Sequence, residues 1–182
     1  DYRLRKTMQL ELRQLQRKLG ITFIFVTHDQ EEALSMSDRV VVMSEGVITQ
    51  VGTPRQVYEE PASLSVAKFI GEVNIFETVV ESVDDGKLTV TLEGMQRTCV
   101  NRKGFAKDDK VLVLVRPEDI RIYDNNEVQD TSNMYRGTVE EVIYKGTTVD
   151  LMVRFESGTL LAATEFFDED DDSLVYTIGE KV

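Results

Sequence analysis

At 182 residues, the chain is long enough to form one large domain or two small ones. Apolar residues make up 41% of the sequence, which supports a packed core and excludes a wholly disordered protein. A single cysteine, Cys99, excludes an internal disulfide framework and fits a reducing compartment, and no apolar run approaches the roughly 20 residues that cross a bilayer.

The charge is distributed unevenly along the chain, whose formal net charge is −12. Residues 1–72 hold 9 basic and 10 acidic side chains, whereas residues 73–182 hold 12 basic and 23 acidic ones. This asymmetry predicts two units with different surfaces, divided near residue 72. A nucleic-acid-binding protein would carry the opposite sign, because neutralisation of phosphates supplies much of its affinity.

The first predicted element is an amphipathic helix that ends near Gly20. Its apolar residues follow steps of four, four, three and four, the spacing of one helix face: Leu4, Met8, Leu12, Leu15 and Leu19. Gly20 adopts positive φ without a Cβ penalty, so it is a natural end for this helix. The stripe is too short for a coiled-coil seam.

An apolar run, Ile21–Val26, follows the helix and contains the residues typical of a strand buried on both faces of a parallel sheet. Thr27, His28 and Asp29 then occupy the carboxyl end of this predicted strand, where open α/β sheets bind ligands. Asp29 is a suitable cap for a helix through about Met36. His28 is the only histidine in the chain, and a lone histidine is by default a solvated or hydrogen-bonded side chain.

Residues 39–71 predict a hairpin and two short helices. Arg39–Met43 and Val47–Val51 flank a Ser-Glu-Gly turn. Thr53, Pro54 and Gln56 combine a capping box with proline at the first helical position, and Pro61 ends that helix. A second helix spans about Ser63 to Ile70 and ends at Gly71, which places a domain boundary at about 71–74.

The stretch FVTHDQEEALSMSDRVVVMSEGVITQVGTPRQVYEEPASLSVAKFIGEVNIF resembles the C-terminal part of the ATPases of ATP-binding-cassette (ABC) importers. THDQEEAL is similar to their switch segment, the H-loop, and GTPRQVYEEP…FIG to the exit from their nucleotide-binding domain. The resemblance implies that His28 contacts the γ-phosphate of ATP. It also matches Asp1 to the last residue of the D-loop, at the interface between two ATPase subunits.

Other motifs of that family are absent from the sequence, which contains no GxxxxGK[ST] phosphate loop, no LSGGQ signature and no apolar strand ending in an Asp-Glu pair. The resemblance therefore implies a fragment of a longer transport ATPase that uses ATP and Mg²⁺, with no cofactor and no ATPase activity expected for the fragment alone. It implies a second ATPase subunit, transmembrane permease subunits and, indirectly, an extracytoplasmic solute-binding protein as partners. The expected location is the cytoplasmic face of the cell membrane.

Residues 73–182 predict short strands separated by turns. Phe76–Val83 and Lys87–Leu92 flank an Asp-Asp-Gly turn, and Val111–Val115 reads as a buried strand. Strands are also predicted over 135–143, 149–155 and 159–166, with a polar loop at 124–133. This spacing favours a small barrel or sandwich over another βαβ unit.

The segments VRPEDIRI and YRGTVEEVIYKGTTVDLMVRF resemble the OB-fold-like regulatory TOBE domain of importer ATPases. NIF and TEFFDEDD are most similar to the ATP-binding subunits of spermidine/putrescine importers. The resulting expectation is an α/β fragment over 1–72, the end of a P-loop NTPase domain, followed by an all-β OB-fold-like barrel over 73–182. The final residues, Gly179–Val182, are predicted to begin a last strand whose continuation is absent from the sequence.

An acidic run follows the last long strand and has two interpretations. Six carboxylates fall within eight positions beside two phenylalanines: Glu165, Asp168, Glu169, Asp170, Asp171 and Asp172. A flexible polyamine would lie along such carboxylates as a regulatory ligand. The alternative is a solvated acidic loop. Arg116-Pro117-Glu118 is interpreted as a structural turn, and Cys99 as an inert thiol.

The leading hypothesis is thus the ATP-hydrolysing subunit of a polyamine importer. A second hypothesis keeps the importer and changes the solute to a sugar, iron or another small solute. A third, from a different class, is an OB-fold ligand- or nucleic-acid-binding module; the acidic charge of residues 73–182 and the lack of interleaved basic and aromatic residues count against nucleic acid. No metal site is expected within the fragment.

Overall fold

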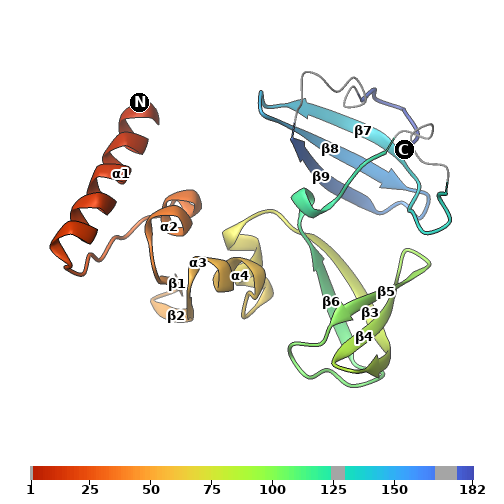
Figure 1. Ribbon diagram of the computed structural model, residues 1–182. Helices are drawn as coiled ribbons and strands as arrows, with labels where there is room; N and C mark the ends of the chain where they lie inside the picture. The colour runs from red at the N-terminus through yellow and green to blue at the C-terminus, as the bar shows by residue number, and fades with distance from the viewer. Residues whose placement is uncertain (1, 124–129, 167–175) are drawn as a thin grey trace. The chain divides into compact units, whose positions relative to one another are not determined.

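The computed structural model describes residues 2–123, 130–166 and 176–182 of the chain (Figure 1). The chain divides into two compact units, Asp1–Glu72 and Val73–Val182. Among the described residues, no helix combines the length and the apolar character needed to cross a membrane.

The first unit is mainly helical. Its elements, in chain order, are α1 (Tyr2–Leu19), α2 (Gln30–Met36), the antiparallel strands β1 (Val40–Ser44) and β2 (Val47–Gly52), α3 (Pro54–Glu59) and α4 (Leu64–Ile70). Its core comprises Val40, Val42, Val57, Val66 and Ile70, with Leu34 and Tyr58 packed against it. The apolar residues of the hairpin and of the last two helices thus bury one another.

Three side-chain caps begin the short helices where the sequence predicts them. Asp29 accepts a hydrogen bond from the Glu32 backbone N–H at the start of α2. At α3, Thr53 accepts from the Gln56 backbone N–H, and the Gln56 side chain accepts from the Thr53 backbone N–H, which confirms the capping box. Ser63 caps α4 in the same way as Asp29 caps α2. Each cap satisfies an amide that the helix leaves unpaired.

The strand predicted over Ile21–Val26 is wrong for this structure, which forms no regular element between α1 and α2. Ile24 and Val26 are each 90% exposed. A strand of a parallel sheet forms only when neighbouring strands take up its backbone hydrogen bonds. The sheet of this unit contains only β1 and β2, and neither pairs with this run. The helix predicted before it does form as α1, but its apolar stripe is solvent-exposed, with Leu4 57% exposed.

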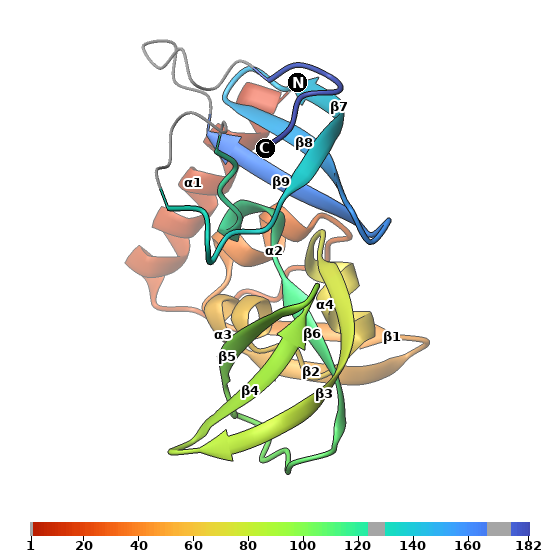
Figure 2. The ribbon, with the colours of Figure 1, turned by 90° about the vertical axis from the view of Figure 1, so that its right-hand side faces the viewer.

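The second unit contains two antiparallel sheets (Figure 2). The first sheet has the order β5-β4-β3-β6 and is built from β3 (Asn74–Asp84), β4 (Lys87–Leu92), β5 (Met95–Val100) and β6 (Lys110–Val115). The second has the order β7-β8-β9 and is built from β7 (Gly137–Tyr144), β8 (Thr148–Phe155) and β9 (Leu160–Phe166). The all-β character expected for this unit is confirmed, and over the described residues its strands form two sheets.

Each sheet of this unit has its own core. Buried residues of the first are Val80, Leu88, Val90, Leu92 and Val111. Those of the second are Val139, Val149, Leu151, Val153 and Ala163. Between β6 and the second sheet the chain forms a short 3₁₀ turn, η1 (Pro117–Asp119), because proline fixes φ and lacks an N–H to continue the ladder. The turn predicted at Arg116-Pro117-Glu118 is thereby confirmed.

The last residues of the chain pair with β7. The backbones of Gly137 and Val182 exchange two hydrogen bonds of 2.9 and 3.0 Å, and Lys181 forms an isolated antiparallel bridge with Thr138. The strand predicted at Gly179–Val182 is present only as this short pairing.

The Asn74 side chain joins the two sheets of the second unit. It is 8% exposed, and its amide nitrogen donates to the carbonyls of Val115, in β6, and Ala162, in β9, at 3.3 and 2.8 Å. Its oxygen accepts from the Ala162 N–H at 2.8 Å. The side chain thus contacts the edge of β9 as a neighbouring strand would.

Candidate functional site

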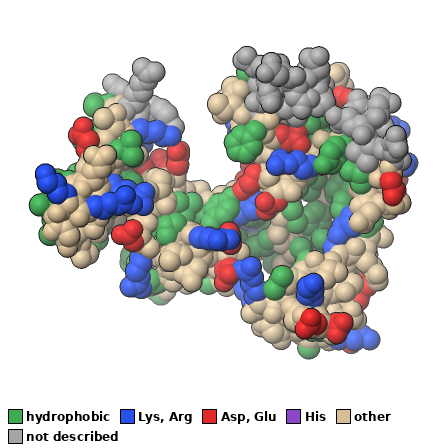
Figure 3. Space-filling model, viewed as in Figure 1, with side chains coloured by type: hydrophobic (Ala, Val, Ile, Leu, Met, Phe, Trp, Pro, Cys, Tyr) green, Lys and Arg blue, Asp and Glu red, His purple; other side chains and the backbone are tan. Residues whose placement is uncertain are grey.

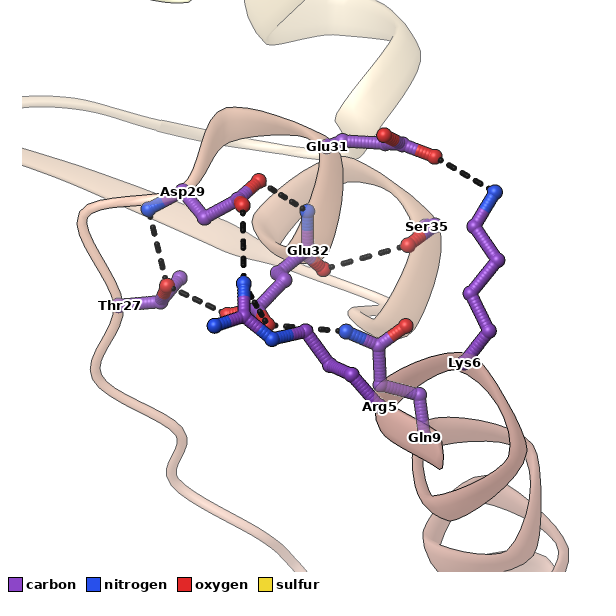
Figure 4. Close-up of polar contacts among 8 residues, drawn as sticks. All are labelled: Arg5, Lys6, Gln9, Thr27, Asp29, Glu31, Glu32 and Ser35. Carbon is purple, nitrogen blue, oxygen red and sulfur yellow. Dashed lines mark hydrogen bonds and ion pairs between the residues drawn. The ribbon is translucent and has the colours of Figure 1, made fainter. Parts of the chain in front are cut away.

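The segment that carries His28 is fixed by its own polar side chains (Figure 4). The Thr27 hydroxyl accepts from the Asp29 backbone N–H at 2.9 Å and donates to the Glu32 carboxylate at 2.7 Å. Asp29 in turn accepts from the Glu32 N–H at 3.1 Å. The residues on both sides of His28 are therefore tied to the first turn of α2.

Helix α1 contacts α2 through polar groups that converge on the same segment (Figure 4). One guanidinium nitrogen of Arg5 lies 3.6 Å from carboxylate oxygens of both Asp29 and Glu32. Gln9 donates to Glu32 at 2.9 Å, and Lys6 lies 3.2 Å from Glu31. An exposed ion pair contributes only about 0–1 kcal/mol, but the Glu32 side chain is 14% exposed and receives several donors at once. These contacts hold α1 against the loop that presents His28.

The His28 side chain itself is exposed and forms no hydrogen bond or ion pair with the described residues. A neutral imidazole offers one donor and one acceptor nitrogen to a ligand. The arrangement can therefore present an imidazole to solvent from a segment whose neighbouring residues are hydrogen-bonded to α2. The role that the sequence assigns to His28 remains a prediction. Asp1, the second expected site residue of this unit, lies outside the described residues.

Glu165 does not lie among exposed acids. It is 5% exposed, and its carboxylate accepts from the Ile122 backbone N–H at 2.8 Å and from the Tyr176 hydroxyl. Its oxygens are thus used within the unit, which leaves them unsuited to a surface ligand. The other acids of the run, Asp168, Glu169, Asp170, Asp171 and Asp172, lie outside the described residues, so their interpretation as a polyamine contact remains a prediction.

Two further residues singled out from the sequence have structural surroundings. Burial raises the pKa of the Cys99 thiol, which keeps it protonated and weakly nucleophilic. Burial lowers the pKa of Arg116, and the nearby Asp119 carboxylate acts in the opposite direction. Asp119 also donates its backbone N–H to the Arg116 carbonyl at 3.1 Å. Both observations agree with the interpretations of an inert thiol and a structural turn.

Two adjoining cavities in the second unit, of about 220 and 540 Å³, were not predicted from the sequence. Tyr135 and Phe155 line both, with ring centroids 5.4 Å apart, and the Arg97 guanidinium lies 4.6 Å from the Tyr135 ring centroid. No motif marks them, because their walls come from segments far apart in the sequence. On the face of this unit shown in Figure 3, basic and acidic side chains are interspersed rather than gathered into a basic stripe.

Part of the second unit matches a known domain family. Residues 113–182 match the family model of the TOBE domain, so a TOBE domain is present in this part of the chain. A solved structure of the cytoplasmic molybdate-binding protein ModG, with molybdate bound, has a TM-score of 0.48 and 16% sequence identity. That likeness covers 59% of this chain and 85% of the ModG chain.

Relatives that match the whole chain share one name. The chain is 56% identical over 182 residues to the spermidine/putrescine import ATP-binding protein PotA of Legionella pneumophila. It is 52% identical over 183 residues to the protein of that name from Nitratidesulfovibrio vulgaris, and 51% over 183 residues to that of Vibrio parahaemolyticus. These matches cover 100% of this chain and 50%, 50% and 48% of the relatives. The chain thus spans about half the length of the curated relatives it matches, and it corresponds to their C-terminal half.

Proposed function

We propose that the chain is the C-terminal portion of the ATP-binding and ATP-hydrolysing subunit of an ABC importer that takes up spermidine and putrescine. The observation that carries this proposal is the 56% identity, over the whole chain and thus through both units, to the spermidine/putrescine import ATP-binding protein of Legionella pneumophila. Residues 1–72 are assigned to the end of the nucleotide-binding domain, and residues 73–182 to the regulatory domain that follows it.

Exposed apolar side chains in the first unit support its assignment to a larger α/β domain. Ile24 and Val26 are each 90% exposed in a run with strand-like composition, and the stripe of α1 is exposed beside it. Burial of apolar surface stabilises a fold by roughly 25 cal/mol per Å², so such a run is suited to a neighbouring sheet. His28 follows this run directly, at the end where nucleotides bind in α/β sheets.

The chemistry assigned to His28 is stabilisation of charge on a phosphate. Phosphoryl transfer depends mainly on positioning and on donors aimed at the γ-phosphate oxygens, and Mg²⁺-bound ATP supplies that phosphoryl group. The imidazole donates one hydrogen bond to such an oxygen while Thr27 and Asp29 hold its backbone in place. Asp1 is assigned to the interface with a second ATPase subunit.

The partners follow from the same proposal. Two ATPase subunits pair with ATP between them and dock on transmembrane permease subunits at the cytoplasmic face of the membrane. A solute-binding protein delivers the polyamine to the permease from the opposite side of the membrane. The solute itself is recognised by those partners rather than by this chain. An importer of a sugar, iron or another small solute is therefore the alternative that a transport assay must exclude.

Substitution of His28 tests the catalytic assignment in the full-length subunit assembled with its permease. His28→Ala should lower ATP turnover by roughly 100-fold or more, because the lost donor acts in the transition state, while ATP binding changes only a few-fold. Glu31→Gln is the matched control, because it breaks an exposed 3.2 Å ion pair with Lys6 one turn away and should leave turnover near the wild-type rate. Wild-type turnover in the His28 variant would remove the assignment.

The solute is tested separately in vesicles that contain the complete importer. The vesicles should take up spermidine and putrescine when ATP is supplied. They should not take up a sugar or a ferric complex. Uptake of a sugar instead would overturn the polyamine assignment and leave the ATPase assignment intact. The 182-residue chain alone should bind ATP no better than about millimolar, and micromolar Mg²⁺-dependent binding would contradict its assignment as a C-terminal portion.

A further inference from the structure

Glu32 carries a shielded carboxylate close to the segment of His28. Its side chain is 14% exposed, whereas those of Asp29 and Glu31, at the same helix start, are 38% and 69% exposed. A carboxylate withdrawn from water is costly unless donors replace its lost hydration. The partners of Glu32 are therefore part of what keeps this segment in its observed conformation.

The two carboxylate oxygens of Glu32 contact different elements (Figure 4). One accepts from the Thr27 hydroxyl at 2.7 Å. The other accepts from the Gln9 amide at 2.9 Å and lies 3.6 Å from a guanidinium nitrogen of Arg5, and both of these residues belong to α1. A single side chain thus connects helix α1 to the residue that directly precedes His28.

The contact between Glu32 and Thr27 goes beyond what helix α2 needs in order to begin. In a capping box, the side chain of the third helical residue accepts from the backbone N–H of the cap residue. Glu32 is the third residue of α2, but the N–H of the cap residue, Asp29, donates instead to the Thr27 hydroxyl at 2.9 Å. Asp29 already caps the helix through its own side chain. The additional link therefore holds Thr27, which lies on the other side of His28 from the helix.

We propose that Glu32 is a positioning residue for His28: its carboxylate holds Thr27, and with it the backbone that carries the imidazole, in a place set by α1. This inference rests on the function proposed for His28, the donation of a hydrogen bond to a phosphate oxygen. Glu32 itself does not touch the nucleotide in this role. A misplacement of about 1 Å can lower a rate about 100-fold, so a residue that only holds another one can control turnover.

The first test measures ATP turnover in the full-length subunit assembled with its permease. Glu32→Ala should lower kcat about 10-fold or more and leave KM for ATP within about threefold, because the position of the imidazole matters most in the transition state. Glu32→Gln keeps an oxygen that can accept from Thr27, so it should recover most of kcat. Glu31→Ala is the control and should stay near the wild-type rate, since the Glu31 carboxylate is exposed and lies 3.2 Å from Lys6.

Double variants show whether Glu32 acts through Thr27 and His28. Added to His28→Ala, Glu32→Ala should lower turnover no further, because the group that it positions is gone. Thr27→Val removes the hydroxyl and nearly keeps the shape of the side chain. Combined with Glu32→Ala, it should lower kcat no more than the larger of the two single losses. A general loss of folding would instead lower turnover in every background.

The second test needs no ATPase activity and uses the 182-residue chain. His28 is the only histidine in the sequence, so histidine-selective ¹⁵N labelling gives a single backbone amide to follow by NMR. The order parameter of this amide should be about 0.85 in the wild type and in Glu31→Ala, and should fall below about 0.6 in Glu32→Ala and Thr27→Val. Thr27→Ser keeps the hydroxyl and should retain the wild-type value.

Three results would overturn the positioning role of Glu32: an unchanged order parameter in Glu32→Ala, a wild-type kcat in that variant, or a further loss of turnover when it is added to His28→Ala. Wild-type turnover in His28→Ala would instead overturn the proposed function, and the positioning role with it. The two failures are distinguishable, because only the second requires an active His28→Ala variant.

Discussion

Replacing Asn74 with alanine should loosen the connection between the two sheets of the second unit. The substitution removes two well-formed hydrogen bonds of 2.8 Å to the Ala162 backbone and a longer one of 3.3 Å to the Val115 carbonyl. Each of the two good hydrogen bonds contributes about 1 kcal/mol, and leaving their part-buried backbone partners unpaired costs about 1–3 kcal/mol more. We therefore expect a loss of about 3–5 kcal/mol in the free energy of unfolding of this unit.

Urea unfolding followed by circular dichroism measures that loss, and hydrogen exchange locates it. Backbone amides of β9 and β6 should exchange faster in the variant, because the contact between the sheets opens first. Asn101→Ala is the matched control. The Asn101 amide makes a similar donor–acceptor pair with the Phe105 backbone, at 2.7 and 2.8 Å, but within a single loop.

The two variants should differ in how they unfold as well as in how much stability they lose. Asn101→Ala should lower the midpoint and leave the slope of the transition unchanged, whereas Asn74→Ala should broaden or divide the transition. A loss of less than about 0.5 kcal/mol for Asn74→Ala, with unchanged exchange in both sheets, would refute the reasoning.

Three further substitutions test local features. A Cβ on Gly137 would lie 2.3 Å from a methyl carbon of Val153, so Gly137→Ala should cost about 1–3 kcal/mol in urea unfolding; adding Val153→Ala should recover part of that loss, and strict additivity would contradict the steric explanation. Thr53→Ala should cost about 0.5–2 kcal/mol by the same measurement because it removes the cap of α3, and no loss would mean that the cap is redundant. The Arg154 guanidinium lowers the pKa of Glu140, so the pair stabilises the fold at neutral pH and less as the pH falls through that lowered pKa. In Arg154→Gln, NMR titration should show the pKa of Glu140 rising towards its ordinary value, and an unchanged pKa would show that another group lowers it.

Local chemistry in the sequence predicts the short helices well. Thr53 and Gln56 satisfy the first amides of α3 from within four residues, so no distant contact is needed to know where that helix begins. The same holds for Asp29 at α2. Likewise, the turn chemistry of Asp85-Gly86, both with positive φ, fixes the β3–β4 hairpin.

Features that depend on distant partners were not predictable in this way. Ile21–Val26 has the composition of a buried strand, but composition does not supply the neighbours that a strand needs. The contact between the two sheets depends on pairings such as that of Asn74 with Ala162, 88 residues apart. For Glu165 a local signal did exist: Leu161 and Ala163 are buried, and the alternation of β9 places Glu165 on the same inward face.

The contact between Glu165 and Tyr176 has a consequence for the nine residues between Phe166 and Tyr176. Because the two flanking residues are bonded to each other and to the Ile122 backbone, the ends of this connection stay together whatever lies between them. Strand β9 and the C-terminal residues are therefore joined by their own side chains as well as by the chain that runs between them.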